Sequence, residues 1–199
     1  EIIKSYRALF WISILLNLMN SKSFSLKLNH KINSYKKSIK VDSDKSLSIR
    51  SFLIASICQN ISYTKNVLES EDVLSAISSL RKLGVKIDKV NPKSYKIYGK
   101  GLGSLFIKKN SELNFGNSGT LARLLIGILS TTPDIEVKIK GDHSLNKRSM
   151  KKLIELMSKF GAEFLPKKKY NFPLKLISSE MPVGISYEAG ISAQLKSAV

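Results

Sequence analysis

LNFGNSGTLARLL, at residues Leu113–Leu125, is the most informative stretch of this chain. It begins as a short apolar strand, breaks at Gly116, and restarts as a helix whose first turn is Asn117–Thr120. The N-terminus of a helix presents unpaired backbone N–H groups and a partial positive charge. The stretch therefore predicts a strand-to-helix turn that attracts phosphate or carboxylate groups.

Four residues of this turn are candidates for the site. Asn117 or Ser118 can cap the helix, and Gly119 lets a ligand approach the backbone closely. Arg123 follows one turn later, where it serves either the ligand or a structural tie between helix and sheet. A turn of this kind is common in proteins, so the interpretation depends on whether the pattern recurs.

The pattern does recur, at equal intervals. A small residue is followed four positions later by a basic one at Ser46–Arg50, Gly119–Arg123 and Ser192–Lys196, each start lying 73 residues after the last. A second pair of similar segments lies between these, at Leu80–Ile87 and Met157–Phe164. The threefold motif and this pair recur independently at similar spacings, which predicts a repeated supersecondary unit.

Hydrophobic periodicity and turn residues predict the order strand, helix, strand, helix, strand, strand, begun three times within one domain. The fold class is therefore α/β (α+β). We expect helices over 45–58, 71–83, 119–132 and 150–160. We expect strands over 38–41, 62–68, 85–89, 95–98, 105–107, 113–115, 135–140, 174–177 and 185–187.

The composition is that of a globular chain with a strong basic excess. There are 33 basic and 15 acidic residues among 199, which gives a formal charge of +18. Such an excess favours nucleic acid, an anionic membrane surface or anionic small molecules as partners. Lysines are scattered, whereas the arginines are few: Arg7, Arg50, Arg81, Arg123 and Arg148.

The single cysteine and the first residues bear on the compartment. Cys58 cannot form an intrachain disulfide, and we expect it to be a core thiol of the first helix, in a reducing, cytoplasmic protein. The apolar run Ala8–Met19 is too short to span a bilayer. Because the chain begins with Glu1 and stops inside an expected helix, we expect both ends to be truncated.

The three turns that open the helices at Ser46, Gly119 and Ser192 together predict a site for a multiply anionic small molecule. Lys45 adds a point charge at a helix start, and Arg148 adds a planar fork suited to carboxylate or phosphate. Most of the lysines are better read as solvated surface charges. No cluster of Cys and His exists in the sequence, so we expect no metal site.

At these residues the chain resembles the N-terminal half of the 3-phosphoshikimate 1-carboxyvinyltransferase (EPSP synthase) family of enolpyruvyl transferases. The resemblance runs from about Lys27 to Val199 and leaves residues 1–26 as an unmatched extension. Five motifs occur in family order: DKSxSxRS at Asp44–Ser51, SEDV at Ser70–Val73, GNSGTxxR at Gly116–Arg123, GDxSLxKRxM at Gly141–Met150 and SAQxKSA at Ser192–Ala198.

The resemblance implies a fold and a reaction. The family has two domains, each an inside-out barrel of three βαβαββ units. Residues 27–199 would be the first domain with its third unit incomplete, and the second domain would be absent. The reaction transfers the enolpyruvyl group of phosphoenolpyruvate to the 5-hydroxyl of shikimate 3-phosphate and releases phosphate, without metal or cofactor.

The resemblance also implies roles for individual residues. Lys45 would be catalytic and close to both ligands. Shikimate 3-phosphate would be held by Lys45, Ser46, Arg50, Ser192, Ala193 and Gln194. Phosphoenolpyruvate would be held by Lys45, Gly119, Arg148 and Gln194. Supporting roles would fall to Asp44, Asn117, Thr120 and Arg123.

The chain departs from the family pattern at three places in these turns. Asp42 and Ser43 stand where the family usually has proline and glycine, and Ser149 stands where it has proline after the arginine. We expect this chain to supply half of the site, to be inactive alone, and to be a monomer at full length, with no nucleic-acid or membrane partner.

Two alternatives stay open. A UDP-N-acetylglucosamine enolpyruvyl transferase would share the fold and chemistry, but that family usually has Asn after the first lysine and a reactive loop cysteine, whereas here Ser46 follows Lys45. A basic nucleic-acid-binding βαβαββ module would need surface aromatics among its basic residues, and the tyrosines are scattered in the sequence.

Overall fold

The structure is a computed structural model that describes residues 27, 38, 41–188 and 190–199. The chain divides into residues 1–40 and residues 41–199, and the fold below is that of the second unit. The apolar run at 8–19 and residues 39 and 40 of the strand expected at 38–41 lie outside the described residues, and residues 38 and 41 are not in a strand.

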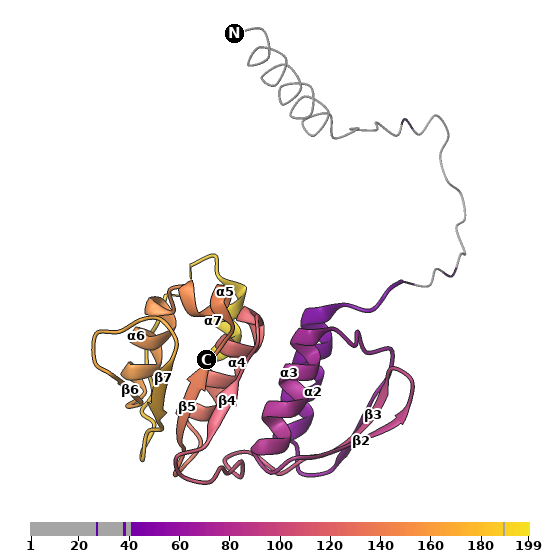
Figure 1. Cartoon of the computed structure of the whole chain (residues 1–199), viewed down its shortest axis with the longest axis horizontal. Coiled ribbons are helices and arrows are strands. Elements are labelled where there is room, and N and C mark those ends of the chain that lie inside the picture. The colour runs from indigo at the N-terminus through magenta and orange to yellow at the C-terminus, as the bar shows by residue number, and fades with distance from the viewer. Residues whose placement is uncertain (1–26, 28–37, 39–40, 189) are drawn as a thin grey trace, which may run out of the picture. The chain divides into compact units, whose positions relative to one another are not determined.

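The first repeat forms two helices and a three-stranded sheet. Its elements are α2 (Lys45–Ile57), β1 (Ile61–Thr64), α3 (Glu71–Lys82), β2 (Lys86–Asn91) and β3 (Ser94–Tyr98). The strands are antiparallel in the order β1-β3-β2, and the two helices lie side by side next to the sheet (Figure 1). The helix expected over 71–83 ends as predicted, because Gly84 adopts a φ of +85° directly after it.

The second repeat has the same plan with one more strand and one more short helix. Its elements are β4 (Glu112–Asn114), α4 (Gly119–Ser130), β5 (Glu136–Lys140), α5 (His143–Lys147), α6 (Lys151–Lys159), β6 (Glu163–Leu165) and β7 (Leu174–Ile177). The sheet order is β4-β5-β7-β6, with β4 parallel to β5 and the other pairs antiparallel.

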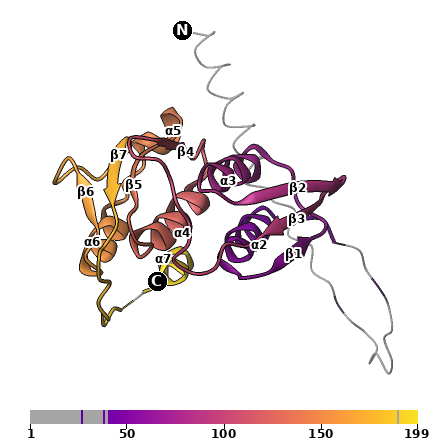
Figure 2. The same cartoon turned by 90° about the horizontal axis from the view of Figure 1, so that it is seen from below.

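The two sheets confirm the repeated unit. The order β5-β7-β6 of the second sheet reproduces β1-β3-β2 of the first, and α7 (Ala193–Ala198) opens a third copy. Figure 2 shows α2 and α4 between the two sheets, so helices lie inside and strands outside. Within the described part of the chain both sheets are open and separate.

The three helices predicted from the repeated motif begin in the same way. Asp44, Ser118 and Ser192 are their N-caps, and each side-chain oxygen accepts the N–H of the leucine three residues later. The donor–acceptor distances are 2.6, 3.2 and 3.4 Å. The repeated local geometry therefore lies in the caps, which are 74 residues apart (118 − 44 and 192 − 118). The small residues of the 73-residue motif fall at shifted positions, because Ser46 is the second residue of α2, Gly119 is the first of α4 and Ser192 is the cap of α7.

Helix α4 is the centre of the core. Most of its apolar side chains are buried, among them Leu121, Leu125 and Ile126, each with no exposed surface, and Ile128 is partly buried. It packs against α2 and α7. Gly127 allows the closest approach, because a Cβ there would overlap the backbone carbonyl of Ala198.

Two expected strands do not form. Residues 105–107 are not a strand, because Phe106 N–H donates to the Leu83 carbonyl and the Phe106 ring covers Gly84. Residues 185–187 are also not a strand, since Ile185 and Tyr187 pack on the core without a pairing partner among the described strands.

The strand expected over 62–68 is also shorter than predicted. It stops at Thr64, because Asn66 adopts a φ of +56° and Val67 N–H turns to the Lys93 carbonyl. The chain therefore leaves the sheet four residues before the end of the expected strand (68 − 64).

The prediction for Cys58 was wrong. Cys58 is the C-cap of α2 and is exposed, not a core thiol, because the helix ends at Ile57. In the sequence, Cys58 falls on the apolar side of the predicted helix, but in the structure the helix ends one residue before it.

The tyrosines are less scattered than the sequence suggests. Tyr63 and Tyr98 share the outer face of the first sheet with Lys96, whose ammonium lies 5.9 and 4.9 Å from their ring centroids. Tyr95 is on the opposite face, where its hydroxyl donates to Glu69 at 2.6 Å. Burial, and then the bond to Glu69, raises the pKa of Tyr95 to about 12.

Gly127→Ala tests the packing of α7 on α4. Alanine in a helix interior normally stabilises relative to glycine by up to about 1 kcal/mol. Here we expect the opposite, a loss of about 1–3 kcal/mol in the free energy of unfolding, because the new Cβ would overlap Ala198. The measurement is urea unfolding followed by circular dichroism.

Gly184→Ala is the matched control, since a Cβ at Gly184 would meet no atom within 4 Å. A Gly127→Ala variant as stable as wild type would contradict the close packing of α7 on α4.

Candidate functional site

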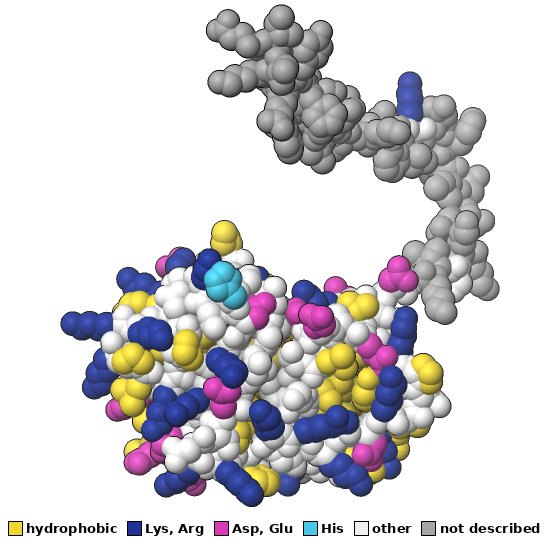
Figure 3. All heavy atoms as spheres, viewed as in Figure 1, with side chains coloured by type: hydrophobic (Ala, Val, Ile, Leu, Met, Phe, Trp, Pro, Cys, Tyr) yellow, Lys and Arg dark blue, Asp and Glu magenta, His cyan; other side chains and the backbone are white. Residues whose placement is uncertain are grey.

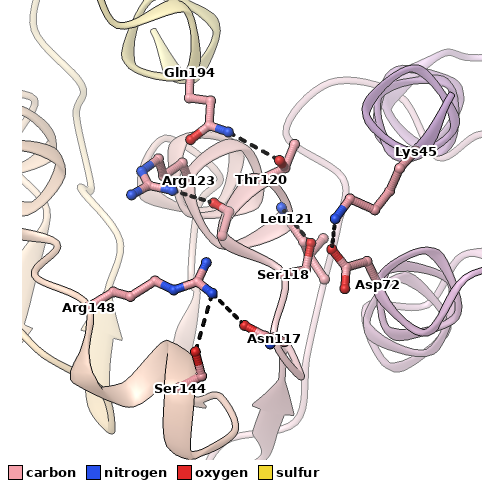
Figure 4. A network of polar contacts seen from close by, with 11 residues as sticks. Lys45, Asp72, Asn117, Ser118, Thr120, Leu121, Arg123, Ser144, Arg148 and Gln194 are labelled. Carbon is pink, nitrogen blue, oxygen red and sulfur yellow. Dashed lines mark hydrogen bonds and ion pairs between the residues drawn. The ribbon is translucent and has the colours of Figure 1, made fainter. Parts of the chain in front are cut away.

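A polar cavity of about 220 Å³ lies where the N-termini of α2, α4 and α7 meet (Figure 4). Its walls come from four helices and two loops. The lining residues are Lys45, Asp72, Asn117, Gly119, Thr120, Arg123, Arg148 and Gln194. Seven of these eight are residues that the sequence singled out, from segments far apart in the chain.

The first turn of α4 forms one wall. Ser118, not Asn117, caps the helix, and its hydroxyl accepts the Leu121 N–H at 3.2 Å. The N–H groups of Gly119 and Thr120 are left as first-turn donors with no intrahelical acceptor. They give the cavity the partial positive charge of a helix N-terminus.

Arg148 reaches the cavity from the end of α5. Its Nη2 donates to the Asn117 side-chain oxygen at 2.7 Å and to the Ser144 hydroxyl at 3.3 Å. Asp142 caps α5 by accepting the Leu145 N–H at 2.7 Å. Its own backbone N–H donates to the Gly116 carbonyl at 2.8 Å, which joins the start of this short helix to the turn before α4. Both partners of Arg148 are neutral, so its charge stays available to a ligand.

Arg123 lies beside Arg148. Its Nη1 donates to the Gly119 carbonyl at 3.0 Å, so it bonds the first turn of its own helix and does not tie the helix to the sheet. Burial, and then the nearby charge of Arg148, lowers the pKa of Arg123. The guanidinium remains protonated at neutral pH, and an anion would relieve this repulsion.

Gly119 is needed for space. A Cβ at this position would lie 2.8 Å from Arg123 Nη1 and 3.2 Å from Arg148 Nη1. The absence of a side chain therefore lets both guanidinium groups approach the free N–H groups of α4.

Lys45 and Asp72 form the opposite wall. The Lys45 ammonium lies 2.9 Å from Asp72 Oδ2, which joins the first turn of α2 to that of α3. Sequence reasoning missed Asp72 as a site residue, because the SEDV motif was taken only as a helix start. The sequence did contain a signal for Asp72, since SEDV is one of the five motifs that occur in family order and the other four all supply predicted site residues.

Gln194 joins the third helix to the second. Its side-chain amide donates to the Thr120 hydroxyl at 3.1 Å, which brings the start of α7 against the start of α4. Together with the Lys45–Asp72 pair, this bond connects the three repeated helix starts around one cavity.

The other predicted residues lie away from this cavity. Ser46 is half-buried in the first turn of α2, and Ala193 is exposed in the first turn of α7. Arg50 lines a separate, mostly apolar cavity of about 720 Å³ between α2, α4 and α7. Ser192 caps α7 and borders a groove beside α6, and Asp44 caps α2.

The predicted set for phosphoenolpyruvate is therefore brought together, and the predicted set for shikimate 3-phosphate is not. All four residues of the first set line the 220 Å³ cavity. Of the second set, only Lys45 and Gln194 do so.

The side chains that line the cavity carry more positive than negative charge. Three cations and a helix N-terminus face one carboxylate, whereas Lys and Arg elsewhere on the visible face are interspersed with Asp and Glu (Figure 3). The described residues contain no group of three or more His, Cys, Asp or Glu arranged to bind a metal. None of the described helices is long and apolar enough to cross a membrane.

The fold and the cavity define a class of protein: repeated units of helices and strands whose helix N-termini converge on a cavity lined by three cations and one carboxylate. A family model described as "EPSP synthase (3-phosphoshikimate 1-carboxyvinyltransferase)" matches residues 30–199. The chain belongs to the EPSP synthase family.

Relatives and solved structures agree with this assignment. The chain is 37% identical over 174 residues to a 3-phosphoshikimate 1-carboxyvinyltransferase of Syntrophomonas wolfei, covering 87% of this chain and 40% of that protein. It is 40% identical over 161 residues to that of Leptospira interrogans, covering 80% and 36%. The solved EPSP synthase from Acinetobacter baumannii superimposes with a TM-score of 0.73 at 33% identity, covering 80% and 36%.

The chain thus spans about two fifths of the length of the relatives that it matches. The mixed α/β fold predicted from the sequence is confirmed by this superposition.

Gly119→Ala tests whether the cavity binds anions through the two guanidinium groups. The new Cβ would push both arginine ends aside, so we expect orthophosphate affinity to fall by about tenfold, as small misplacements in a tight site do. Because flexible side-chain ends can move, the melting temperature is expected to stay near the wild-type value. Calorimetric titration with orthophosphate measures the first quantity and differential scanning calorimetry the second.

An unchanged phosphate affinity in Gly119→Ala would show that the anion does not contact this wall. Gly184→Ala again serves as the control, because it adds a methyl group to open space.

Proposed function

We propose that this chain is the N-terminal substrate-binding part of a 3-phosphoshikimate 1-carboxyvinyltransferase. The reaction is transfer of the enolpyruvyl group of phosphoenolpyruvate to the 5-hydroxyl of shikimate 3-phosphate, with release of phosphate, in chorismate and aromatic amino-acid biosynthesis. The observation that carries the proposal is the pair of guanidinium groups, held by neutral partners, at the N-terminus of α4. Family membership supports it.

Phosphoenolpyruvate fits the charge of the cavity. It carries a carboxylate and a phosphate, and the cavity offers the Arg148 fork, the Gly119 and Thr120 N–H groups, and the Lys45 ammonium. A planar guanidinium binds either anion through two parallel hydrogen bonds. We assign Lys45, Gly119, Arg148 and Gln194 to this ligand, with Asn117, Thr120 and Arg123 as supports.

Shikimate 3-phosphate would extend from the same cavity toward α2 and α7. Lys45 and Gln194 would contact both ligands, and Ser46, Ser192 and Ala193 lie at the two neighbouring helix starts. Arg50 would have to turn from the apolar cavity that it lines toward the ligand. Asp44 supports this part by fixing the start of α2.

The physical role of the site is to bring two anions together. Their mutual repulsion opposes binding, and fixed cations and N–H dipoles offset it. Charge that develops on the transferred group would meet donors already in position. In this proposal Lys45, at the boundary between the two ligands, is the catalytic residue.

We propose further that the protein acts in the cytoplasm, as a monomer at full length, with no nucleic-acid or membrane partner. The competing nucleic-acid reading gains some support from Tyr63, Tyr98 and Lys96 on one sheet face. Two measurements distinguish the hypotheses. If the protein binds nucleic acid, its affinity for an oligonucleotide would fall steeply as the salt concentration rises. If it binds shikimate 3-phosphate, that ligand would raise the melting temperature by mass action.

Arg148→Ala is the sharpest test of the ligand assignment. Loss of a charge-assisted, bidentate contact is expected to cost about 2–4 kcal/mol of phosphoenolpyruvate binding. We expect far less effect on shikimate 3-phosphate, which has no assigned contact with Arg148. Titration calorimetry with each ligand measures both affinities.

Lys147→Ala is the control for Arg148→Ala, since it removes one positive charge from the adjacent, exposed position. If both ligands weaken equally in Arg148→Ala, Arg148 is structural or serves the whole cavity.

A second test concerns the isolated chain. Because it spans 36–40% of its relatives' length, we propose that residues 27–199 supply about half of the catalytic site, and that catalysis needs further groups closing around both anions. The expected result is weak binding of shikimate 3-phosphate and no turnover in a phosphate-release assay. Measurable turnover would refute the half-site proposal, and a folded chain that fails to bind shikimate 3-phosphate would refute the residue assignments.

A further inference from the structure

We infer that Asp72 is a positioning residue that holds the Lys45 ammonium at the wall of the anion cavity. The inference rests on the proposed function, because it concerns the ligand that Lys45 meets. It assigns a role to the one carboxylate among the lining residues.

The geometry makes Asp72 the partner of Lys45. The Lys45 Nζ and Asp72 Oδ2 atoms are 2.9 Å apart, and the Asp72 side chain is 17% exposed against 48% for Lys45. The less exposed and shorter side chain is the anchor, and the long lysine is the part that it directs. Figure 4 shows the pair facing the start of α4 across the cavity.

The backbone fixes the carboxylate more firmly than the ammonium. Asp72 is the second residue of α3, at a helix N-terminus that favours a negative charge, and Val73 beside it is fully buried. Lys45 is the first residue of α2, and its four-carbon chain has no other ion pair among the described residues. Without Asp72 this chain would sample many rotamers toward solvent.

Two physical effects of Asp72 on anion binding have opposite signs. A carboxylate beside the site repels an anion, so simple Coulomb attraction predicts that its removal tightens binding. Preorganisation predicts the reverse, because an ordered Lys45 loses less conformational freedom when the ligand arrives. The positioning role requires that the second effect exceed the first.

The direction of the affinity change in Asp72→Asn shows which effect is larger, because loss of repulsion would tighten binding and loss of preorganisation would weaken it. We expect Asp72→Asn to weaken phosphoenolpyruvate binding by about five- to tenfold in titration calorimetry. Asp72→Glu, which keeps the charge on a longer side chain, is expected to recover part of the affinity. Glu71→Gln is the matched control, because it removes one acid from the same first turn of α3 at an exposed position with no ion pair among the described residues.

A second readout does not depend on any ligand. An ammonium held in an ion pair exchanges its protons with water more slowly than a free one, so Lys45 should give a ¹⁵N side-chain signal in solution. We expect this signal in the wild-type chain and in Glu71→Gln, and its loss in Asp72→Asn. Thermal unfolding of all variants verifies that each is folded at the temperature used.

The outcomes distinguish this inference from the proposed function. Wild type that binds phosphoenolpyruvate, with Asp72→Asn binding equally or more tightly, overturns the positioning role alone. Wild type that binds neither substrate overturns the proposed function, and the ammonium signal then decides whether Asp72 orders Lys45. Loss of that signal in both Asp72→Asn and Glu71→Gln also overturns the inference.

Discussion

Burial of α4 organises this protein. A helix with Leu121, Leu125 and Ile126 wholly inside the core must be covered by other helices as well as by a sheet, and α2 and α7 provide that cover. Gly127 sets how closely α7 approaches. Because the three helices come from the same repeated unit and share the same cap geometry, packing them together also gathers their N-termini. The cavity is a consequence of that packing.

The charges in the cavity are held mainly by neutral groups. Arg148 bonds an amide oxygen and a hydroxyl, and Arg123 bonds a backbone carbonyl, so neither guanidinium is neutralised by a carboxylate of the described residues. Such an arrangement costs stability, which the lowered pKa of Arg123 reflects. It is physically reasonable where a multiply charged anion supplies the missing negative charge. Lys45 differs, because it already has a carboxylate partner in Asp72.

The convergence of the helix starts explains why the residues assigned to phosphoenolpyruvate lie together, whereas most of those assigned to shikimate 3-phosphate do not. Residues at the very start of a helix, such as Gly119 and Gln194, meet where the helices converge. Arg50 lies more than a turn further along α2, so it borders the apolar space between helices. The chain belongs to the EPSP synthase family, and in its described residues the cavity is formed by side chains at these helix starts and in the neighbouring loops.

Sequence alone determined the repeated unit and most of the residues that line the cavity, because these depend on local patterns: a small residue at a helix start, a basic residue one turn on, and apolar periodicity between them. It left the cap of α4 open between Asn117 and Ser118, and the structure shows Ser118 in that role. Tertiary structure decided what depends on neighbours distant in the chain. The run at 105–107 is apolar but bonds to Leu83 and does not join a sheet. Cys58 is exposed and not in the core, because α2 ends at Ile57, one residue before the predicted end. Asp72 became part of the cavity only when α3 packed beside α2, since nothing local pairs it with Lys45.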